Sequence, residues 1–349
     1  MMDFKEKTGY MDLLLEIRNN MAMKKIVVVG DYYLDKYIYI DGMKNQSVYS
    51  GGFAFDVEKA IYAPGAAGTI AKNFANLGMK NIYAVGLSGK DGDGYELREK
   101  LKSLHINIDN LIITDEMTTP TYTMVMKRMQ GQYKEIGEIA KHSNKTVPMG
   151  LQRELKEKLI RLIDSINPDA VIFLDQLDHS SMGVINQDMK KTINYIKKKN
   201  PQLTVIVDSR SSIDEITADV IRKCNEKEFC STYKVQEYEI ITKCYELSIG
   251  NKEPIIVTLG EKGTLISKDG QHFMVSAFNV LGEQDTRGAG DAFTTGYILA
   301  KSCKLDEYSA GMIGNLFASC CVSQVATTGV MNLELIENLF GTGKTRMVG

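Results

Sequence analysis

Alternation between short apolar runs and amphipathic stretches constrains this chain more than any other feature of its sequence. The first run, Lys25–Gly30, is rich in β-branched residues, which is typical of a strand buried on both faces of a parallel sheet. The pattern predicts an α/β fold with a doubly wound, mostly parallel sheet and helices on both faces. Further strands are predicted near 81–86, 169–174, 203–207 and 254–259, helices near 66–77, 93–104, 150–165, 183–199 and 234–246, and a mostly helical segment over 290–340.

Two segments, about 36–63 and 119–137, depart from this alternation. Tyr37–Ile40 and Thr121–Met126 alternate like exposed strands, and each segment is too short to build a core alone. We expect them to form together a small β-sheet placed over the main domain.

The rest of the domain organisation follows from helix patterns at the two ends. Leu13, Leu14 and Ile17 fall on one side of a short helix, so 1–22 is predicted to be an N-terminal helical extension. Residues 23–340 form the main domain, which includes the small sheet, and 341–349 read as a tail.

Composition excludes several classes of protein. The chain has 349 residues, 44% hydrophobic and 25% charged, with a net charge of −2, so it offers no electrostatic footprint for nucleic acid or an anionic membrane. The six cysteines form no CxxC pair, and reduced thiols are expected. Without an apolar run of about 20 residues, we expect a cytoplasmic protein.

A candidate catalytic stretch runs from Asp285 to Phe293. Gly288, Ala289 and Gly290 lie where a loop enters an apolar helix, and the first amides of a helix have no intrahelical partner. Small residues let an anion approach these amides, so the stretch predicts a cradle for phosphate oxygens. Asp291 falls in the first turn, where it could take the proton of an attacking hydroxyl. An ordinary helix start with a capping acid is the competing interpretation.

The whole string Asp285–Phe293 resembles D-T-x-G-A-G-D-x-F, the second signature of the ribokinase-like (PfkB) carbohydrate kinases. The resemblance implies an ATP-dependent kinase with Mg²⁺ as cofactor and a small-molecule sugar or sugar phosphate as acceptor. It makes Asp291 the base and the amides of Gly288, Ala289 and Gly290 the anion hole. It also implies a potassium ion near the loop that begins at Asp285, and a β lid that closes on the sugar and forms a homodimer contact.

Candidate acceptor-binding residues follow the first strand. Asp31 and Asp35 stand at its carboxyl end, where ligands bind in open α/β sheets; a turn with capping acids is the alternative. The stretch Gly30–Asp35 resembles the opening of heptose-7-phosphate kinases, and the family's sugar-binding acid matches Asp35. Pro64–Gly78 is similar to the first signature and supplies Gly65, although Pro64 and Gly68 replace the usual Gly and Asn.

Nucleotide and metal candidates are spread over the second half of the chain. Some have a purely structural alternative: a surface salt bridge for Asp208 and Arg210, a solvated strand edge for Lys127, or a satisfied helix residue for Asn315. The family's N-x-x-E motif is placed at Lys234–Glu237, with Lys234 in the position of the Asn. The candidates are Thr258, Gly260 and Gly263 (T-x-G-x-x-G), Asn315 and Asp285 for the nucleotide side, Glu237 and Asp208 for the metal, and Arg210 and Lys127 for an anionic substrate.

The predicted function is therefore transfer of the γ-phosphoryl group of ATP to a hydroxyl of a sugar or sugar phosphate, with heptose-7-phosphate kinases as the nearest type. Two alternatives stay open. The acceptor could be another small molecule such as a nucleoside, or the chain could be a catalytically weak, kinase-like sugar-binding regulatory protein. Lys234 and Gly68 favour the second alternative, while Asp291 and its glycines oppose it.

Overall fold

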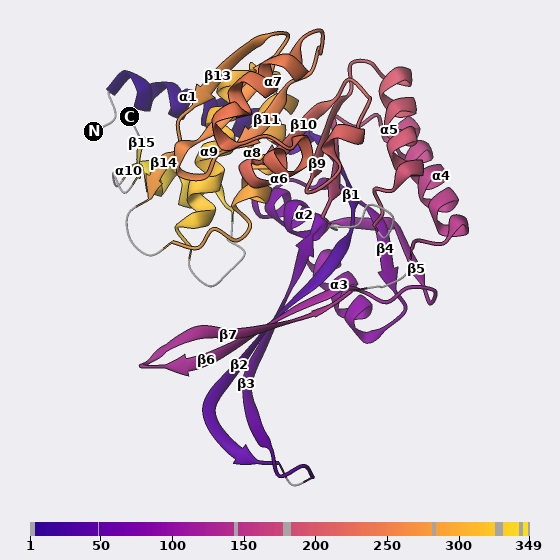
Figure 1. Cartoon of the computed structure of the whole chain (residues 1–349), viewed down its shortest axis with the longest axis vertical. Coiled ribbons are helices and arrows are strands. Elements are labelled where there is room, and N and C mark those ends of the chain that lie inside the picture. The colour runs from indigo at the N-terminus through magenta and orange to yellow at the C-terminus, as the bar shows by residue number, and fades with distance from the viewer. Residues whose placement is uncertain are drawn as a thin grey trace.

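A large twisted sheet forms the body of the protein, and a long narrow sheet projects from it (Figure 1). The body buries two apolar clusters, one on each face of the large sheet. The computed structural model describes residues 4–47, 49–142, 146–176, 183–280, 284–324, 331–341 and 345–347.

The large sheet has nine strands among the described residues, in the order β13-β12-β11-β10-β9-β8-β1-β4-β5. The seven strands from β11 to β5 are parallel, whereas β12 and β13 extend the sheet antiparallel at one edge. Their bounds are β1 (Lys25–Gly30), β4 (Asn81–Gly89), β5 (Asn107–Thr114), β8 (Ala170–Asp175), β9 (Thr204–Ser209), β10 (Ile221–Asn225), β11 (Ile255–Thr258), β12 (Thr264–Lys268) and β13 (Gln271–Val275).

Helices cover both faces of this sheet, which confirms the doubly wound architecture. One cluster joins alternate residues of β1, such as Ile26 and Val28, to α1, α2, α3, α8, α9 and α10. The other joins Val27 and Val29 to α4, α5, α6 and α7. The helices are α1 (Phe4–Asn20), α2 (Ala67–Asn76), α3 (Gly92–Ser103), α4 (Met149–Ile166), α5 (Gln187–Lys199), α6 (Glu226–Tyr233), α7 (Ile240–Ser248), α8 (Ala289–Ser302), α9 (Glu307–Val322) and α10 (Leu333–Gly341).

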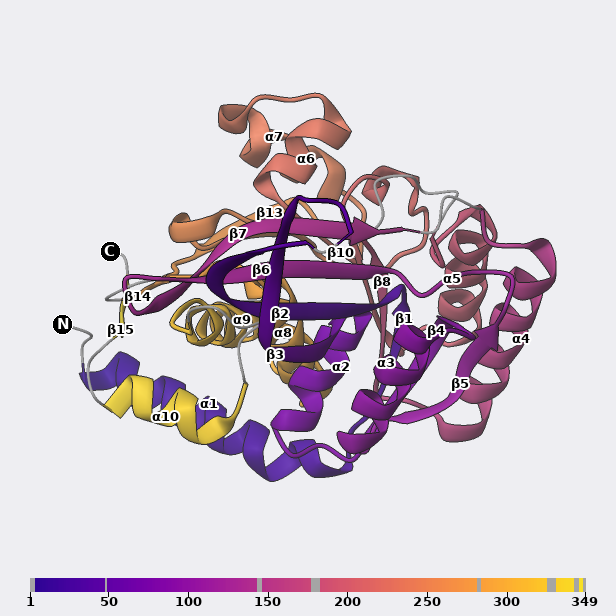
Figure 2. The same cartoon turned by 90° about the horizontal axis from the view of Figure 1, so that it is seen from below.

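The two terminal helices lie side by side along one edge of the body (Figure 2). Leu14 and Ile17 of α1 are buried in the same cluster as Ile336 of α10, and Arg18 pairs with Glu337 at 3.1 Å. The N-terminal segment expected to be an extension therefore packs into the core of the body.

The projecting sheet has four strands in the order β3-β2-β6-β7. β2 (Tyr32–Gln46) begins one residue after β1 ends, and β3 (Phe53–Ala66) runs directly into α2. β6 (Thr121–Met129) and β7 (Gln132–Lys141) complete the sheet, with β2 and β6 parallel. The strands are longer than the expected segments 36–63 and 119–137 and cross each other as a twisted arm (Figures 1 and 2). This four-stranded sheet is called the lid sheet below.

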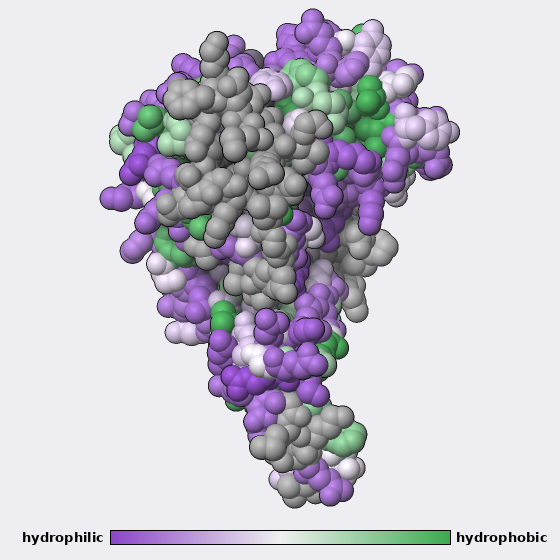
Figure 3. All heavy atoms as spheres, turned by 90° about the vertical axis from the view of Figure 1, so that its left-hand side faces the viewer, coloured by the Kyte–Doolittle hydropathy of each residue, from purple (hydrophilic) through white to green (hydrophobic). Residues whose placement is uncertain are grey.

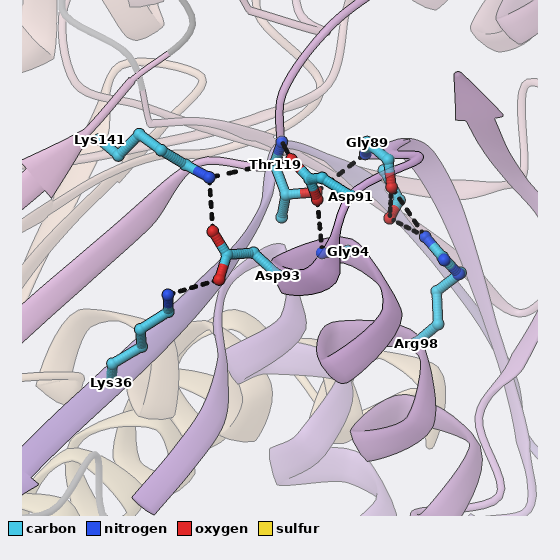
Figure 4. Close-up of polar contacts among 9 residues, drawn as sticks. Lys36, Gly89, Asp91, Asp93, Gly94, Arg98, Thr119 and Lys141 are labelled. Atoms are coloured by element: carbon cyan, nitrogen blue, oxygen red, sulfur yellow. Dashed lines mark hydrogen bonds and ion pairs between the residues drawn. The ribbon is translucent and has the colours of Figure 1, made fainter. Parts of the chain in front are cut away.

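The base of the lid sheet is tied to the first turn of α3 (Figure 4). Asp93 pairs with Lys36 of β2 and with Lys141 of β7. Asp91 caps α3 by accepting a hydrogen bond from the amide of Gly94 at 2.7 Å, and it also accepts one from the amide of Thr119 at 2.9 Å. Gly89–Gly94 is thus a structural turn with an N-cap.

The structure differs from the sequence expectations in the strands β5, β10, β12 and β13, which were not predicted, and in two further regions. The helix expected over 234–246 is broken, because Lys234 adopts a left-handed conformation (φ 54°) that ends α6, and α7 starts only at Ile240. In the segment expected to be a tail, Thr345–Met347 forms β15 and pairs with β14 (Phe278–Val280). Within the described ranges, no helix is long and apolar enough to cross a membrane.

Candidate functional site

A pocket of about 700 Å³ lies at the carboxyl ends of β9, β10 and β11, beside the start of α8. This is the edge at which parallel α/β sheets bind ligands. The structure brings ten of the predicted site residues together in its lining. They are Asp208, Arg210, Thr258, Gly260, Gly263, Gly288, Ala289, Gly290, Asp291 and Asn315.

The start of α8 forms the floor of this pocket. Gly288 is its N-cap with φ 76°, a left-handed conformation that favours glycine, and no side chain caps the helix. The Ala289 amide donates to the carbonyl of Thr286 at 3.2 Å. Across the described residues, the amides of Gly288 and Gly290 form no hydrogen bond. Two of the three predicted amides are therefore available to an anion.

Asp291 lines the pocket from the first turn of α8. Burial raises the pKa of its carboxyl to about 7, and the nearby Asp208 carboxylate adds to this rise, while Lys223 and Arg210 oppose it. A carboxyl whose pKa lies near neutrality is well suited to accept a proton from an alcohol.

Asp208, predicted as a metal-site residue, is held in a buried ion pair. Lys223 Nζ lies 2.6 Å from Asp208 Oδ2, and Thr294 Oγ1 donates to the same oxygen at 2.9 Å. Burial alone would lower the pKa of Lys223, but the Asp208 carboxylate raises it above the usual value, so Lys223 is a cation. Gly290 is close to this cation, since a Cβ there would lie 3.5 Å from Lys223 Nζ. The pair thus places positive charge beside the amides of α8, a role for Lys223 that the sequence did not suggest.

The structure does not bring Glu237, the other predicted metal-site residue, into the pocket. Glu237 is exposed in a short 3-10 turn before α7. Instead, Asn225 and Glu228 line the pocket. They close a capping box at the start of α6, in which the Asn225 amide donates to Glu228 Oε2 at 2.7 Å.

Asn225–Glu228 is itself an N-x-x-E sequence that directly follows β10. The spacing was therefore present in the chain and was missed because β10 was not predicted. Burial and the nearby Asp208 raise the pKa of Glu228. The N-x-x-E motif is thus intact in the pocket, and the substitution by Lys234 has no bearing on it.

The predicted nucleotide residues line the far side of the pocket. Thr258 ends β11, and Gly260 and Gly263 bound the short turn that leads into β12. The Asn315 amide is fully engaged: its Oδ1 accepts from Thr264 Oγ1 at 2.7 Å, and its Nδ2 donates to backbone carbonyls at 2.9 and 3.1 Å. Asn315 therefore fixes the pocket wall and keeps its polar atoms inside the protein.

A second group of charged residues lies where the lid sheet meets α2. A Cβ on Gly65 would come within 2.5 Å of Asp35 Oδ1, so Gly65 makes room for this carboxyl. Burial raises the pKa of Asp35 to about 6, an effect that Lys72 counteracts and Glu138 strengthens. Burial lowers the pKa of Lys72, whose charge is supported by Asp35 and Asp291. Lys72 on α2, which sequence reasoning missed, thus links the predicted sugar-binding acid to the predicted base.

Three other predicted residues lie outside the large pocket. Asp31 lines a small cavity of about 30 Å³, and its Oδ1 accepts from the Val184 amide at 3.0 Å. Lys127 lies on β6 of the lid sheet. Asp285 lies at the start of the loop before α8, where Arg287 binds its carboxylate. A potassium ion, implied there by the sequence resemblance, does not fit a carboxylate whose two oxygens already accept hydrogen bonds from a guanidinium.

A sheet edge with bare helix amides, an acid of raised pKa and a projecting lid is an arrangement suited to phosphoryl transfer to a small alcohol. The model of the pfkB family of carbohydrate kinases matches residues 23–333, and the chain belongs to this family. As a member of this family it is a carbohydrate kinase, that is, a phosphotransferase with an alcohol acceptor.

Curated relatives match most of the length of this chain. The chain is 26% identical over 328 residues to the bifunctional protein HldE of Bradyrhizobium sp. strain ORS 278, covering 92% of this chain and 64% of that protein. HldE of Koribacter versatilis is 26% identical over 341 residues, covering 95% and 66%. The chain thus spans slightly less than two thirds of these relatives.

The same fold occurs in kinases of low sequence identity. Ribokinase of Arabidopsis thaliana, solved with ribose and ATP, is 19% identical with a TM-score of 0.65, covering 91% of this chain and 98% of that one. Phosphofructokinase-2 of Escherichia coli, solved with potassium, is 16% identical with a TM-score of 0.72, covering 92% and 99%.

Ribokinase-family kinases use ATP with a divalent metal ion. No group of three or more His, Cys, Asp or Glu side chains in the described part of the chain could hold such an ion. Glu228 and the side-chain amide of Asn225, both in the pocket lining, fit a hydrated ion bound mainly through phosphate oxygens, which is how Mg²⁺ is usually held.

Proposed function

We propose that this kinase transfers the γ-phosphoryl group of ATP to a hydroxyl of a sugar phosphate of the heptose 7-phosphate type. The observation that carries the proposal is Asp291, a carboxyl with a pKa of about 7 in the same pocket as the bare amides of Gly288 and Gly290. Resemblance of Gly30–Asp35 to heptose-7-phosphate kinases supports the acceptor class.

The acceptor hydroxyl gives its proton to Asp291 while its oxygen forms a bond to the γ-phosphorus, and the bond from that phosphorus to the leaving ADP oxygen breaks. The amides at the start of α8 and the Lys223 cation stabilise negative charge on the transferred group. Mg²⁺, held through water by Glu228, would neutralise phosphate charge. Thr258, Gly260 and Gly263 would line the nucleotide phosphates.

Asp35 would bind sugar hydroxyls, with Gly65 leaving space beside it and Lys72 holding its charge. The lid sheet, whose strands carry Asp35 and Gly65, would close over the acceptor and exclude water. Arg210 lines the pocket with an exposed side chain and would contact an anionic substrate.

A homodimer through the lid sheet is part of the proposal. The edge strands of the lid sheet, β3 and β7, expose apolar side chains, among them Phe53 (72% exposed), Val57 (56%) and Ile139 (64%). The side of the arm seen in Figure 3 is mostly hydrophilic with isolated apolar residues, so the contact would bury edges rather than a broad apolar face. The six free cysteines support a reducing compartment such as the cytoplasm.

The test is a screen of ADP release with free sugars, sugar phosphates and nucleosides as acceptors. We expect release above background with a heptose 7-phosphate, and loss of about three orders of magnitude in turnover for Asp291→Asn with ATP affinity retained. Activity restricted to a nucleoside or a free sugar would contradict the acceptor class. Undiminished acceptor-dependent release by Asp291→Asn would contradict the catalytic role.

A further inference from the structure

Arg287, the first of the two variable residues in the second signature, binds the carboxylate of Asp285. Its Nε lies 3.0 Å from Oδ1 and 3.1 Å from Oδ2, and its Nη2 lies 2.6 Å from Oδ2. The Arg287 amide also donates to Oδ1 at 3.1 Å. The Asp285 side chain is 10% exposed and that of Arg287 is 41% exposed, so this is a multidentate ion pair with a buried carboxylate and a partly exposed guanidinium.

The same guanidinium reaches the lid sheet. Arg287 Nη1 lies 2.6 Å from Oε2 of Glu135 on β7. The loop is also fixed to α9, because the Asp285 amide donates to the carbonyl of Val322 at 3.0 Å and Cys321 Sγ donates to the Arg287 carbonyl at 3.3 Å. Arg287 therefore connects the loop before α8 with β7 of the lid sheet and with α9.

A monovalent cation at this loop would have to share Asp285 with the guanidinium. Two cations on one carboxylate repel each other, and a cation gives up its water only for oxygens that are free to coordinate it. The guanidinium supplies the same single positive charge. It is tethered two residues away, so it loses less freedom on binding than an ion taken from solution.

We propose that the guanidinium of Arg287 takes the place of a monovalent cation at the loop leading into α8, so that catalysis by this chain requires no potassium. The inference rests on the proposed function for its kinetic test. In this arrangement Glu135 of the lid sheet binds Nη1 of the guanidinium, while Asp285 binds Nε and Nη2.

The kinetic test compares ADP release in potassium chloride and in tetramethylammonium chloride at equal ionic strength. Wild-type rates should agree within about twofold, because screening is the same in both salts. Arg287→Ser should lose about tenfold or more in tetramethylammonium, since the amides of α8 lose their support, and should recover in potassium. Arg161→Ser, which removes an exposed arginine near Glu157 on α4, is the matched control and should behave as wild type.

Thermal unfolding in the same two salts gives a readout that needs no activity. Potassium should raise the Tm of Arg287→Ser relative to tetramethylammonium and leave the wild-type Tm unchanged. Severalfold activation of the wild type by potassium, or a potassium-dependent rise of its Tm, would overturn the inference. So would an Arg287→Ser variant that neither recovers activity nor gains Tm in potassium. A wild type inactive with every acceptor in both salts would defeat the proposed function, and the Tm comparison would still decide the role of Arg287.

Discussion

Asp208, Asp31 and Asp291 all lie near the carboxyl ends of the central strands, but their immediate neighbours give the three carboxyl groups different contacts. Asp208 has Lys223 at 2.6 Å and is committed to an ion pair. Asp31 Oδ2 has no hydrogen-bond partner among the described residues, and burial raises its pKa to about 7. Asp291 has a similar pKa but faces the large pocket. Position in the pocket, rather than pKa alone, therefore favours Asp291 as the proposed base.

The pH dependence of turnover should follow Asp291. Its ionised form is the one that accepts a proton, and its raised pKa of about 7 means that this form is lost as the pH falls through neutrality. We expect kcat/KM to be flat above about pH 8 and to fall about tenfold per unit below about pH 6. Initial rates from pH 5.5 to 9 with saturating ATP measure this profile, and a rate that is flat across this range would contradict the assignment.

Glu228 and Glu237 offer a matched pair of substitutions. Glu228→Gln removes one carboxylate from the pocket, and we expect KM for magnesium–ATP to rise about tenfold, since the charge proposed to hold the hydrated ion is lost. Glu237→Gln lies outside the pocket and should stay within about twofold of wild type. Magnesium titrations at fixed ATP distinguish the two variants. Equal effects would reject the placement of the motif at Asn225–Glu228.

At the scale of elements, the lid sheet depends on its anchor at α3. Asp93 pairs with lysines from both β2 and β7, and its side chain is 23% exposed. Each ion pair of this kind contributes about 1 kcal/mol at most. Losing one would therefore change the ratio of open to closed lid by about fivefold.

Lys141→Met should accordingly raise KM for the acceptor about fivefold and increase ADP release without acceptor, because water enters a lid that closes less often. Lys102→Met, which removes an exposed pair with Glu99 on the same helix, is the control. Steady-state kinetics with and without acceptor measure both effects. A lid that does not move would leave both quantities unchanged.

Strands could be predicted from the sequence where a run of apolar residues was not interrupted by charged ones. The apolar runs of β1, β8 and β9 are almost wholly buried, so periodicity alone identified them. β10 was missed because charged Arg222 and Lys223 interrupt its pattern, and the Lys223 charge is tolerated only through Asp208 on the neighbouring strand. A contact between strands far apart in the chain leaves no local signal.

Single side chains of the site were harder to predict than its location. The glycines before α8 and Asp291 follow from the chemistry of a helix start, and the pocket indeed forms there. Lys72 and Arg287 lie on segments that the sequence had already singled out. Their partners, Asp35 for Lys72 and Glu135 for Arg287, become visible only when the lid sheet is folded over α2 and α8.

At the scale of the whole molecule, the arm is the natural place for contact with a second copy. We expect a dimer in solution, measured by light scattering after size-exclusion chromatography. Ile139→Lys, at a 64% exposed position on the edge strand β7, should shift it toward monomer, because a charge on an edge opposes strand-to-strand association. Tyr238→Lys, 83% exposed near α7, should leave the mass unchanged. A monomeric wild type would contradict the proposed assembly.

The continuity of β2 and β3 has a mechanical consequence. Both strands run from the far end of the arm, through register shifts near Ile40, to the residues proposed to lie beside the acceptor, Asp35 on one and Gly65 on the other. Contact of a second copy with the distal end of the arm would therefore rotate both strands slightly. This rotation would change the space around Asp35 at their other end. Binding of an acceptor beside Asp35 and contact at the distal arm would then each depend on the same rotation of these two strands.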